Sequence, residues 1–184
     1  MTPEANKVTI SDVWLMHVDG SAGSQKGGAG ILLQGPNLLE LEYAVKLDFE
    51  VANNEAEYEA LIIGLNIAKK LKVERLSVYT DSQLVAMQIE GSYETREVMM
   101  INYLRKVKDL MNNFKTCEVH QVPREENERA DALSKFGAMM YGVRSRKVTL
   151  LVAEKSELAQ DLEVNVLCVQ PAESWKDPYI RYLA

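Results

Sequence analysis

The chain has 184 residues, of which 47% are hydrophobic, and its 27 acidic and 21 basic residues give a formal net charge of −6. This length can bury the core of one domain of roughly 100 to 150 residues and leave a tail. The charge excludes a strong overall attraction for phosphate groups, so any binding to nucleic acid has to be local, assisted by metal ions, or assisted by a partner.

The sequence lacks the marks of secreted, zinc-binding and membrane proteins. Cys117 and Cys168 lie far apart without zinc-site spacing, so neither a disulfide framework nor a zinc site is indicated. Charged residues interrupt every apolar run before the roughly 20 residues that a membrane span needs, and the first residues contain no signal-peptide core. These features predict an intracellular protein, cytoplasmic or nuclear, without membrane contact or a readable targeting signal.

Three strands are predicted first, and the turns between them favour two antiparallel hairpins. A helical repeat of apolar residues follows from Asn54 to Leu71. The order of the elements predicts an α/β fold, with a five-stranded mixed sheet, helices on both faces, and a ligand site beyond the carboxyl ends of the strands. The strands are predicted over 13–19, 29–34, 38–47, 75–80 and 116–122, and the later helices over 82–89, 97–114 and 126–136.

The character of the sequence changes after about residue 140. Strands are predicted over 147–153 and 164–169 and a helix over 155–162, but no turn residues connect them to the preceding domain. We therefore divide the chain into an N-terminal extension (1–11), a domain (12–138) and a C-terminal linker or tail (139–184).

Four acidic residues are candidates for chemistry because of their positions. Asp19 and Asp81 end predicted strands, Glu57 lies in the first helix and Asp131 in the last. Acids at such positions commonly cap helices or complement the helix dipole, so Asp81 or Asp131 alone is as readily structural as catalytic.

Glu57 is the most informative of these acids. At about 100° per residue it falls within roughly 40° of Leu61 and Ala68 on the apolar face of its helix, whereas Glu55 and Glu59 point away. A carboxylate that faces the core must be paired, protonated or bound to a metal ion, because desolvating it alone is costly.

Together the four acids predict a metal site at the carboxyl edge of the sheet. Carboxylates so close repel one another, and a hard cation stabilises such a cluster. Ligation by oxygen alone favours Mg²⁺ or Mn²⁺ over zinc. Two ions about 4 Å apart would activate a water and stabilise the leaving oxygen in a phosphoryl displacement.

Four segments around these acids resemble the signature motifs of ribonuclease H type 1, in the same order over residues 12–138. The resemblance implies a ribonuclease H-like fold, with Asp19, Glu57, Asp81 and Asp131 as ligands of two Mg²⁺ (or Mn²⁺) ions. It also implies hydrolysis of the RNA strand of an RNA/DNA hybrid, leaving a 5′-phosphate and a 3′-hydroxyl. The segments are Val18-Asp19-Gly20-Ser21, Asn53-Asn54-Glu55-Ala56-Glu57, Thr80-Asp81-Ser82-Gln83 and Asn127-Glu128-Arg129-Ala130-Asp131-Ala132-Leu133.

The same resemblance implies residues that contact the substrate. Several of the matching family positions touch the minor groove of the hybrid, where the 2′-hydroxyls of RNA are displayed. Local capping is the alternative reading, since Asn54 can cap the first helix and Ser82 the second. The implied substrate-binding residues are Gly20, Ser21, Asn53, Asn54, Ser82, Gln83 and Arg124.

Two features depart from the best-known bacterial pattern of this family. Gln121 stands where a histidine thought to assist product release is expected, and the neighbouring His120 should face the other side of its strand as a core or edge residue. The surrounding sequence resembles the histidine-lacking branch, in which an arginine at the position of Arg124 takes over that role. The second departure is the absence of a dense basic cluster over 83–115, where charges of both signs alternate.

Longer stretches resemble the ribonuclease H segment of a gypsy-type retrotransposon polyprotein in its plant form. The segments NNEAEYEALIIGL, TDSQLV and VPREENERADALSKFG carry this resemblance, and 174–183 resembles a connection toward an integrase-like region. A reverse transcriptase domain of the same polyprotein is then an implied partner beside the RNA/DNA hybrid. The alternative function is a non-catalytic hybrid-binding or scaffolding remnant, which the acidic charge and the missing histidine favour and the four acids argue against.

Overall fold

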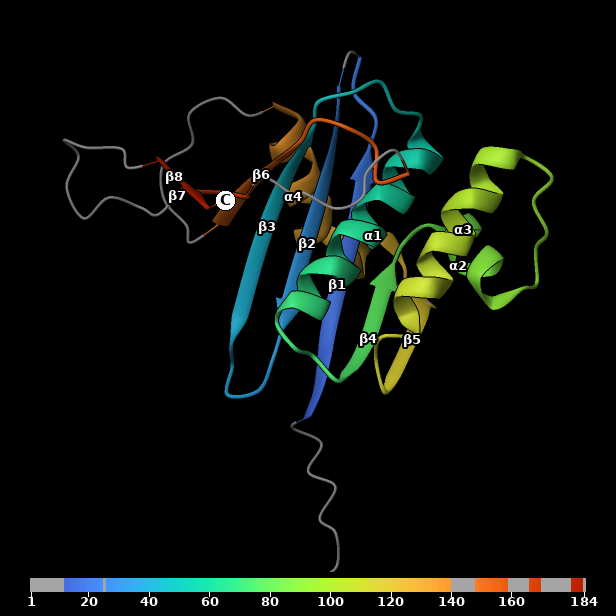
Figure 1. The fold of residues 1–184 in the computed structure, drawn as a ribbon, viewed down its shortest axis with the longest axis horizontal. Helices are drawn as coiled ribbons and strands as arrows, with labels where there is room; N and C mark the ends of the chain where they lie inside the picture. Colours follow the sequence, from blue (N-terminus) through green and yellow to red (C-terminus); the bar gives the residue numbers. More distant parts are fainter. Residues whose placement is uncertain (1–11, 25, 140–147, 159–165, 170–179, 184) are drawn as a thin grey trace, which may run out of the picture.

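The chain folds around one mixed β-sheet. The structure is a computed structural model, and it describes residues 12–24, 26–139, 148–158, 166–169 and 180–183. The strands in this part of the chain lie in the order β5-β4-β1-β2-β3-β6-β7-β8 (Figure 1). They are β1 (Val13–Ser21), β2 (Gly27–Gln34), β3 (Glu40–Leu47), β4 (Arg75–Thr80), β5 (Thr116–Gln121), β6 (Val148–Ala153), β7 (Val166–Val169) and β8 (Ile180–Leu183). The helices are α1 (Asn53–Lys70), α2 (Gln83–Glu90), α3 (Val98–Met111) and α4 (Glu128–Met139), with a 3₁₀ turn η2 (Arg124–Asn127) before α4.

The pairing of the strands brings several carboxyl ends to one edge of the sheet. β1, β2 and β3 form the two predicted antiparallel hairpins. β4 pairs in parallel with both β1 and β5, so these three strands end at the same side of the molecule. In this register Val18 lies opposite Thr80, which places the residues that follow them, Asp19 and Asp81, next to each other.

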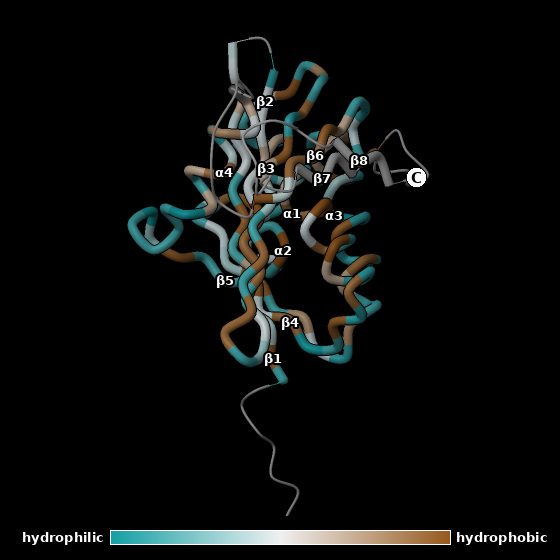
Figure 2. The backbone as a smooth tube through the Cα atoms, turned by 90° about the vertical axis from the view of Figure 1, so that its left-hand side faces the viewer, coloured by the Kyte–Doolittle hydropathy of each residue, from teal (hydrophilic) through white to brown (hydrophobic). Residues whose placement is uncertain are grey.

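Helices cover both faces of the sheet, as predicted. Figure 2 views the sheet from its edge, with α4 on one side and α1 and α3 on the other. The larger core lies under α1 and α3 and includes Met16, Val18, Leu61, Leu65 and Val107, all at most 1% exposed. A smaller cluster lies under α4.

Glycine allows two helices to approach the strands at backbone contact. A Cβ atom added to Gly30 on β2 would lie 2.1 Å from the carbonyl oxygen of Ala130 in α4, and one added to Gly20 on β1 would lie 2.1 Å from that of Ala56 in α1. Any larger residue would force either helix away from the sheet. Both contacts lie next to predicted site residues.

The sheet differs from the prediction at its far edge. It has eight strands instead of five, because β6 pairs in parallel with β3, Ala153 opposite Leu47, and is followed by β7 and β8. Part of the predicted tail therefore extends the sheet. Parallel pairing between distant segments leaves no turn signal in the sequence. The predicted helix over 155–162 is wrong for 155–158, which form a bend and a turn.

Other expectations for the ends of the chain are not tested by the structure. The predicted N-terminal extension, residues 1–11, and most of the connection toward an integrase-like region lie outside the described residues. The division into domains at residue 138 stays a prediction. Among the described helices, none combines the length and apolar character that crossing a bilayer requires.

The glycine contact with α4 leads to a testable prediction about stability. Gly30→Ala should destabilise the fold by about 1–3 kcal/mol, because the new methyl group overlaps the backbone of α4 at Ala130 and Ser134. Urea denaturation of both chains gives this difference. Ala132→Ser, at an exposed position on the same helix, should change stability by less than about 0.5 kcal/mol. An unchanged midpoint for Gly30→Ala would show that α4 does not pack this closely.

Candidate active site

Three of the four predicted acids come together at the carboxyl edge of the sheet. Asp19, Glu57 and Asp81 each offer a carboxylate oxygen, and these oxygens all lie within 4.8 Å of one another. They come from β1, from α1 and from the residue that follows β4. The helical phase predicted for Glu57 is therefore confirmed.

Local hydrogen bonds hold two of these carboxylates in place. The Ser134 hydroxyl on α4 donates to Oδ2 of Asp19 at 2.5 Å. The backbone N–H of Gly20 donates to Oε2 of Glu57 at 3.2 Å. Both bonds depend on the close helix–strand contacts, since α4 carries Ser134 over the glycines of β2 and α1 carries Glu57 over Gly20.

Burial and mutual repulsion make the ionised forms of Asp19 and Glu57 unfavourable. Asp19 is 4% exposed. Burial is the largest cause that raises its pKa to about 6, with Asp81 and Asp131 adding to the shift and the Ser134 bond opposing it. Burial likewise raises the pKa of Glu57 to about 9, and the charges of Asp19 and Asp81 contribute. The cluster thus favours a bound proton or a bound cation.

Asp131 lies at the margin of this cluster. Its carboxylate is close enough to raise the pKa of both Asp19 and Glu57. It also forms ion pairs, with Lys135 Nζ at 2.7 Å and with Arg124 Nη2 at 3.6 Å. The structure therefore brings three of the predicted acids together and leaves the fourth beside them, in ion pairs with Arg124 and Lys135.

The predicted substrate-binding residues surround the acids, and their capping roles are partly as expected. Ser82 caps α2, since its hydroxyl accepts the N–H of Val85 at 3.3 Å. The cap predicted for Asn54 is wrong, because α1 begins at Asn53 and its N-cap is Ala52. The Glu55 carboxylate accepts the Ala52 N–H at 3.0 Å, which is the reciprocal bond of a capping box at this helix start.

Most of the other predicted contact residues lie at the surface of this edge. Asn53 Oδ1 accepts the N–H of Ala22 at 3.2 Å, which ties the loop after β1 to the start of α1. Asn54 and Gln83 are exposed, whereas Gly20 is buried under α1. Ser21 has a buried hydroxyl without a hydrogen-bond partner among the described residues.

The end of β5 and the turn after it, where the family's histidine is expected, place Arg124 beside Asp131. His120 lies on β5, the edge strand, stacks at a tilt on Tyr79 and contacts Glu118, which confirms the prediction of an edge residue. The Gln121 side chain donates to the adjacent carbonyl of Val122. Arg124, which follows this strand, pairs with Asp131.

Three residues that support the site or the helices that form it were not identified from the sequence. Asn127 is buried and donates to the carbonyl of Val18 at 2.9 Å, fixing the turn before α4 to the end of β1. Ser134 supports Asp19. Glu59, predicted to point away from the core, is wholly buried on another side of α1. The position of Asn127 in the last motif could have indicated its role, but no feature of the sequence indicated the roles of Ser134 or Glu59.

Comparisons with known proteins match this part of the chain. The family model described as "Reverse transcriptase-like" matches residues 17–137. Ribonuclease HI of Halobacterium salinarum is 32% identical over 108 residues, covering 59% of this chain and 50% of the relative. The chain thus spans about half the length of this curated relative.

Two solved structures show the same architecture. RNase H1 from Halobacterium salinarum superposes with a TM-score of 0.66 and 26% identity, covering 70% of this chain and 99% of that one. LC11-RNase H1, solved in complex with an RNA/DNA hybrid, gives a TM-score of 0.59 and 26% identity, covering 68% and 96%. The chain has the ribonuclease H-like fold and belongs to the reverse transcriptase-like family.

Proposed function

We propose that this chain hydrolyses the RNA strand of RNA/DNA hybrids and leaves a 5′-phosphate and a 3′-hydroxyl. Asp19, Glu57 and Asp81 would hold two Mg²⁺ (or Mn²⁺) ions, and Asp131 would join them from its position beside the cluster. The observation that carries the proposal is the approach of three carboxylate oxygens within 4.8 Å, at the edge where the parallel strands end.

The donor set fits hard divalent cations. All the candidate ligands are carboxylate oxygens, the type that Mg²⁺ and Mn²⁺ prefer. The raised pKa values of Asp19 and Glu57 mean that ionising them in the metal-free chain is costly, and a bound cation would offset that cost. When bound, the ions would activate a water molecule and stabilise the leaving oxygen of the phosphodiester.

The remaining residues support this chemistry by orientation. The Ser134 hydroxyl and the Gly20 N–H hold the carboxylates of Asp19 and Glu57 in one orientation. These side chains therefore lose little conformational freedom when a ligand binds. Asn53 holds the loop after β1 close to the start of α1, where exposed polar groups can meet the minor groove of a hybrid. Arg124 would supply a positive charge beside Asp131 at the place of the missing histidine.

The surface charges favour help from a partner in binding substrate. The Arg129 guanidinium is engaged by Glu40 and Glu42, and Lys135 by Asp131, so cations near the site are largely neutralised. We propose that a reverse transcriptase domain of a gypsy-type polyprotein supplies the missing basic surface. The motifs quoted above and the match to the reverse transcriptase-like family support this origin.

The alternative function is a non-catalytic hybrid-binding or scaffolding remnant. The ion pairs of Asp131 with Lys135 and Arg124 favour it, because they occupy an acid that the proposed reaction requires. The two functions differ in the need for carboxylate charge, since binding alone does not depend on an intact metal site.

Removing one carboxylate charge should separate these functions. Asp19→Asn or Asp81→Asn should lower hybrid cleavage at least about a hundredfold, because the amide keeps the side-chain shape but loses the charge that holds the cation. Cleavage of a labelled hybrid in Mg²⁺ gives the rate, and circular dichroism confirms the fold. Near-normal rates in either variant would eliminate the proposed site.

The two neighbouring acids at the start of α1 provide a matched pair. Glu57→Gln should lose most activity, whereas Glu55→Gln should retain it, since Glu55 lies outside the cluster and accepts only the Ala52 N–H. The glutamine keeps an oxygen that can accept the same N–H, so stability should change by less than about 0.5 kcal/mol. Comparable losses of cleavage from both variants would mean that α1 presents a different face to the site.

The raised pKa values predict how stability of the metal-free chain depends on pH. Folded pKa values of about 6 for Asp19 and about 9 for Glu57 lie above the usual unfolded value of about 4. The folded state therefore holds protons that the unfolded state has released, and the free energy of unfolding should fall as pH rises from about 5 to about 9. Urea denaturation in EDTA tests this, and saturating Mg²⁺ should flatten the dependence. Stability that increases over this range without metal would contradict the assignment.

A further inference from the structure

We propose that residues 148–158 act as a C-terminal strap that holds α1 in place at the active site, with Glu59 as the positioning residue that anchors it. The inference rests on the proposed function where it concerns metal binding. The strap lies beyond the part of the chain that matches the family model, which ends at residue 137. The strap is therefore a structural element that this chain has in addition to the residues that match the family model.

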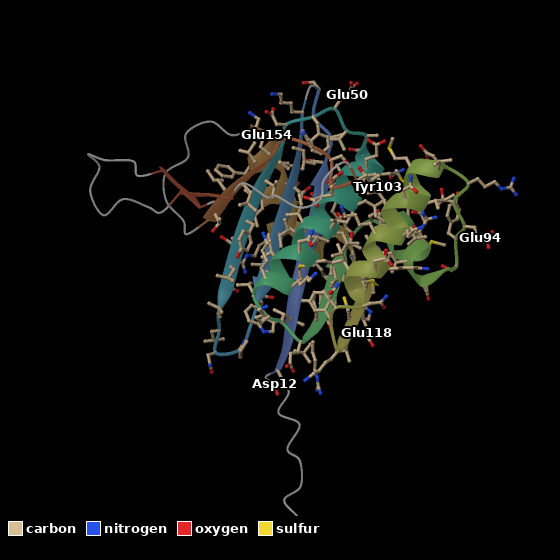
Figure 3. The ribbon with its side chains drawn as sticks, in the orientation of Figure 1. Asp12, Glu50, Glu94, Tyr103, Glu118 and Glu154 are labelled. Atoms are coloured by element: carbon tan, nitrogen blue, oxygen red, sulfur yellow. The ribbon has the colours of Figure 1, made fainter. Side chains whose placement is uncertain are left out.

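The strap runs from β6, which lies between β3 and β7 in the sheet, to the helices α1 and α3. Its first part is β6, where Leu151 and Ala153 are buried in the larger core. The carbonyl of Ala153 accepts the N–H of Asp48 at 2.8 Å. The chain then continues past Glu154 toward α1 and α3, where Tyr103 lies (Figure 3). Leu158 packs against the same core.

Glu59 is the point where α1, α3 and the strap meet. It is 0% exposed, and four hydrogen bonds from three donor groups reach its carboxylate. Tyr103 of α3 donates at 2.6 Å, and the strap donates through the Ser156 hydroxyl at 2.5 Å and through the Glu157 N–H at 3.0 and 3.1 Å. A buried carboxylate without such donors would be strongly destabilising, so the strap and α1 depend on each other.

A second contact ties the strap to α3. Lys106 Nζ donates to the carbonyl oxygen of Glu157 and lies 4.0 Å from its Oε2. Glu157 is 1% exposed, and Oε2 has no hydrogen-bond partner among the described residues. The strap is therefore bonded to both α1 and α3.

The anchor lies on the side of α1 that faces away from the sheet. Gly64 of α1 faces Met16 and Val18 on β1, and Glu59 is about 140° around the helix from it. On the sheet side, α1 is in backbone contact with Gly20, whose N–H bonds Glu57. The helix is thus held from both sides, within two residues of Glu57.

Release of the strap should loosen this geometry. Glu59 would keep only the Tyr103 hydroxyl of its three donor groups, and a shift of α1 would be one way for its carboxylate to reach water. A shift of α1 would lengthen the bond between Gly20 and Glu57 and spread the carboxylates. We therefore expect weaker metal binding without any change in the metal-binding residues themselves.

Two stacked tyrosines provide a matched test in the full chain. Tyr103→Phe removes a hydroxyl that bonds Glu59, while Tyr58→Phe removes one that bonds Gln88 at 2.5 Å, and the two rings stack 5.4 Å apart. Glu59→Leu removes the whole anchor, and Glu59→Gln keeps an acceptor for the strap. The readouts are hydrogen exchange of 148–158 and of the first turn of α1, and calorimetric Mg²⁺ affinity without nucleic acid.

We expect the variants that weaken the anchor most to show both the fastest hydrogen exchange and the weakest Mg²⁺ binding. Glu59→Leu should increase exchange in both segments and weaken Mg²⁺ binding about tenfold, in line with the loss of buried hydrogen bonds, and Tyr103→Phe and Glu59→Gln should have smaller effects in the same direction. Tyr58→Phe should leave the exchange of the strap unchanged. At saturating Mg²⁺, the rate of hybrid cleavage should be closer to that of the unmodified chain in Glu59→Gln than in Glu59→Leu.

Faster exchange of the strap with unchanged exchange of α1 and unchanged Mg²⁺ affinity would overturn the proposal. If Glu59→Leu does not fold, Tyr103→Phe and Ser156→Ala decide by the same readouts. If the unmodified chain binds no Mg²⁺, the proposed metal site fails by itself. Exchange in the first turn of α1 then decides whether the strap positions that helix.

Discussion

The arrangement of this molecule depends on bringing carboxylates from separate elements into one small volume despite their repulsion. Glycine makes this possible, because Gly20 admits the backbone of α1 and Gly30 admits that of α4. These contacts carry Glu57 and Ser134 to Asp19, while the parallel pairing of β1 with β4 sets Asp81 beside it. The chemistry of the site therefore follows from how closely the helices pack on the sheet.

The cost of this cluster has to be offset by the rest of the fold. Burial raises the pKa values of Asp19 and Glu57, so their ionised forms weaken the metal-free protein. The core under α1 and α3 and the hydrogen bonds around Glu59 oppose that effect by holding α1 against the sheet. A bound cation would turn the same cluster from a source of instability into a source of stability.

Much of the fold was predictable because it is encoded locally. Periodicity and turns predicted β1 to β5 and all four helices, and the helical phase predicted the inward direction of Glu57. Apart from the helix cap at Asn54, the failures involve contacts between distant segments. Glu59 was expected to face away from the core, but α3 and the strap cover that side of α1. The pairing of β6 with β3 likewise depends on residues that only the folded chain brings together.

The most direct test of the account is strand-specific cleavage by the unmodified chain. The substrate is an RNA/DNA hybrid labelled on each strand in turn, with duplex DNA and duplex RNA as controls, in Mg²⁺ and then in Mn²⁺. The account predicts cleavage of the RNA strand of the hybrid alone, dependent on the divalent ion, with 5′-phosphate and 3′-hydroxyl ends. Binding of the hybrid without cleavage at saturating concentrations of both ions would contradict it and would support a non-catalytic module.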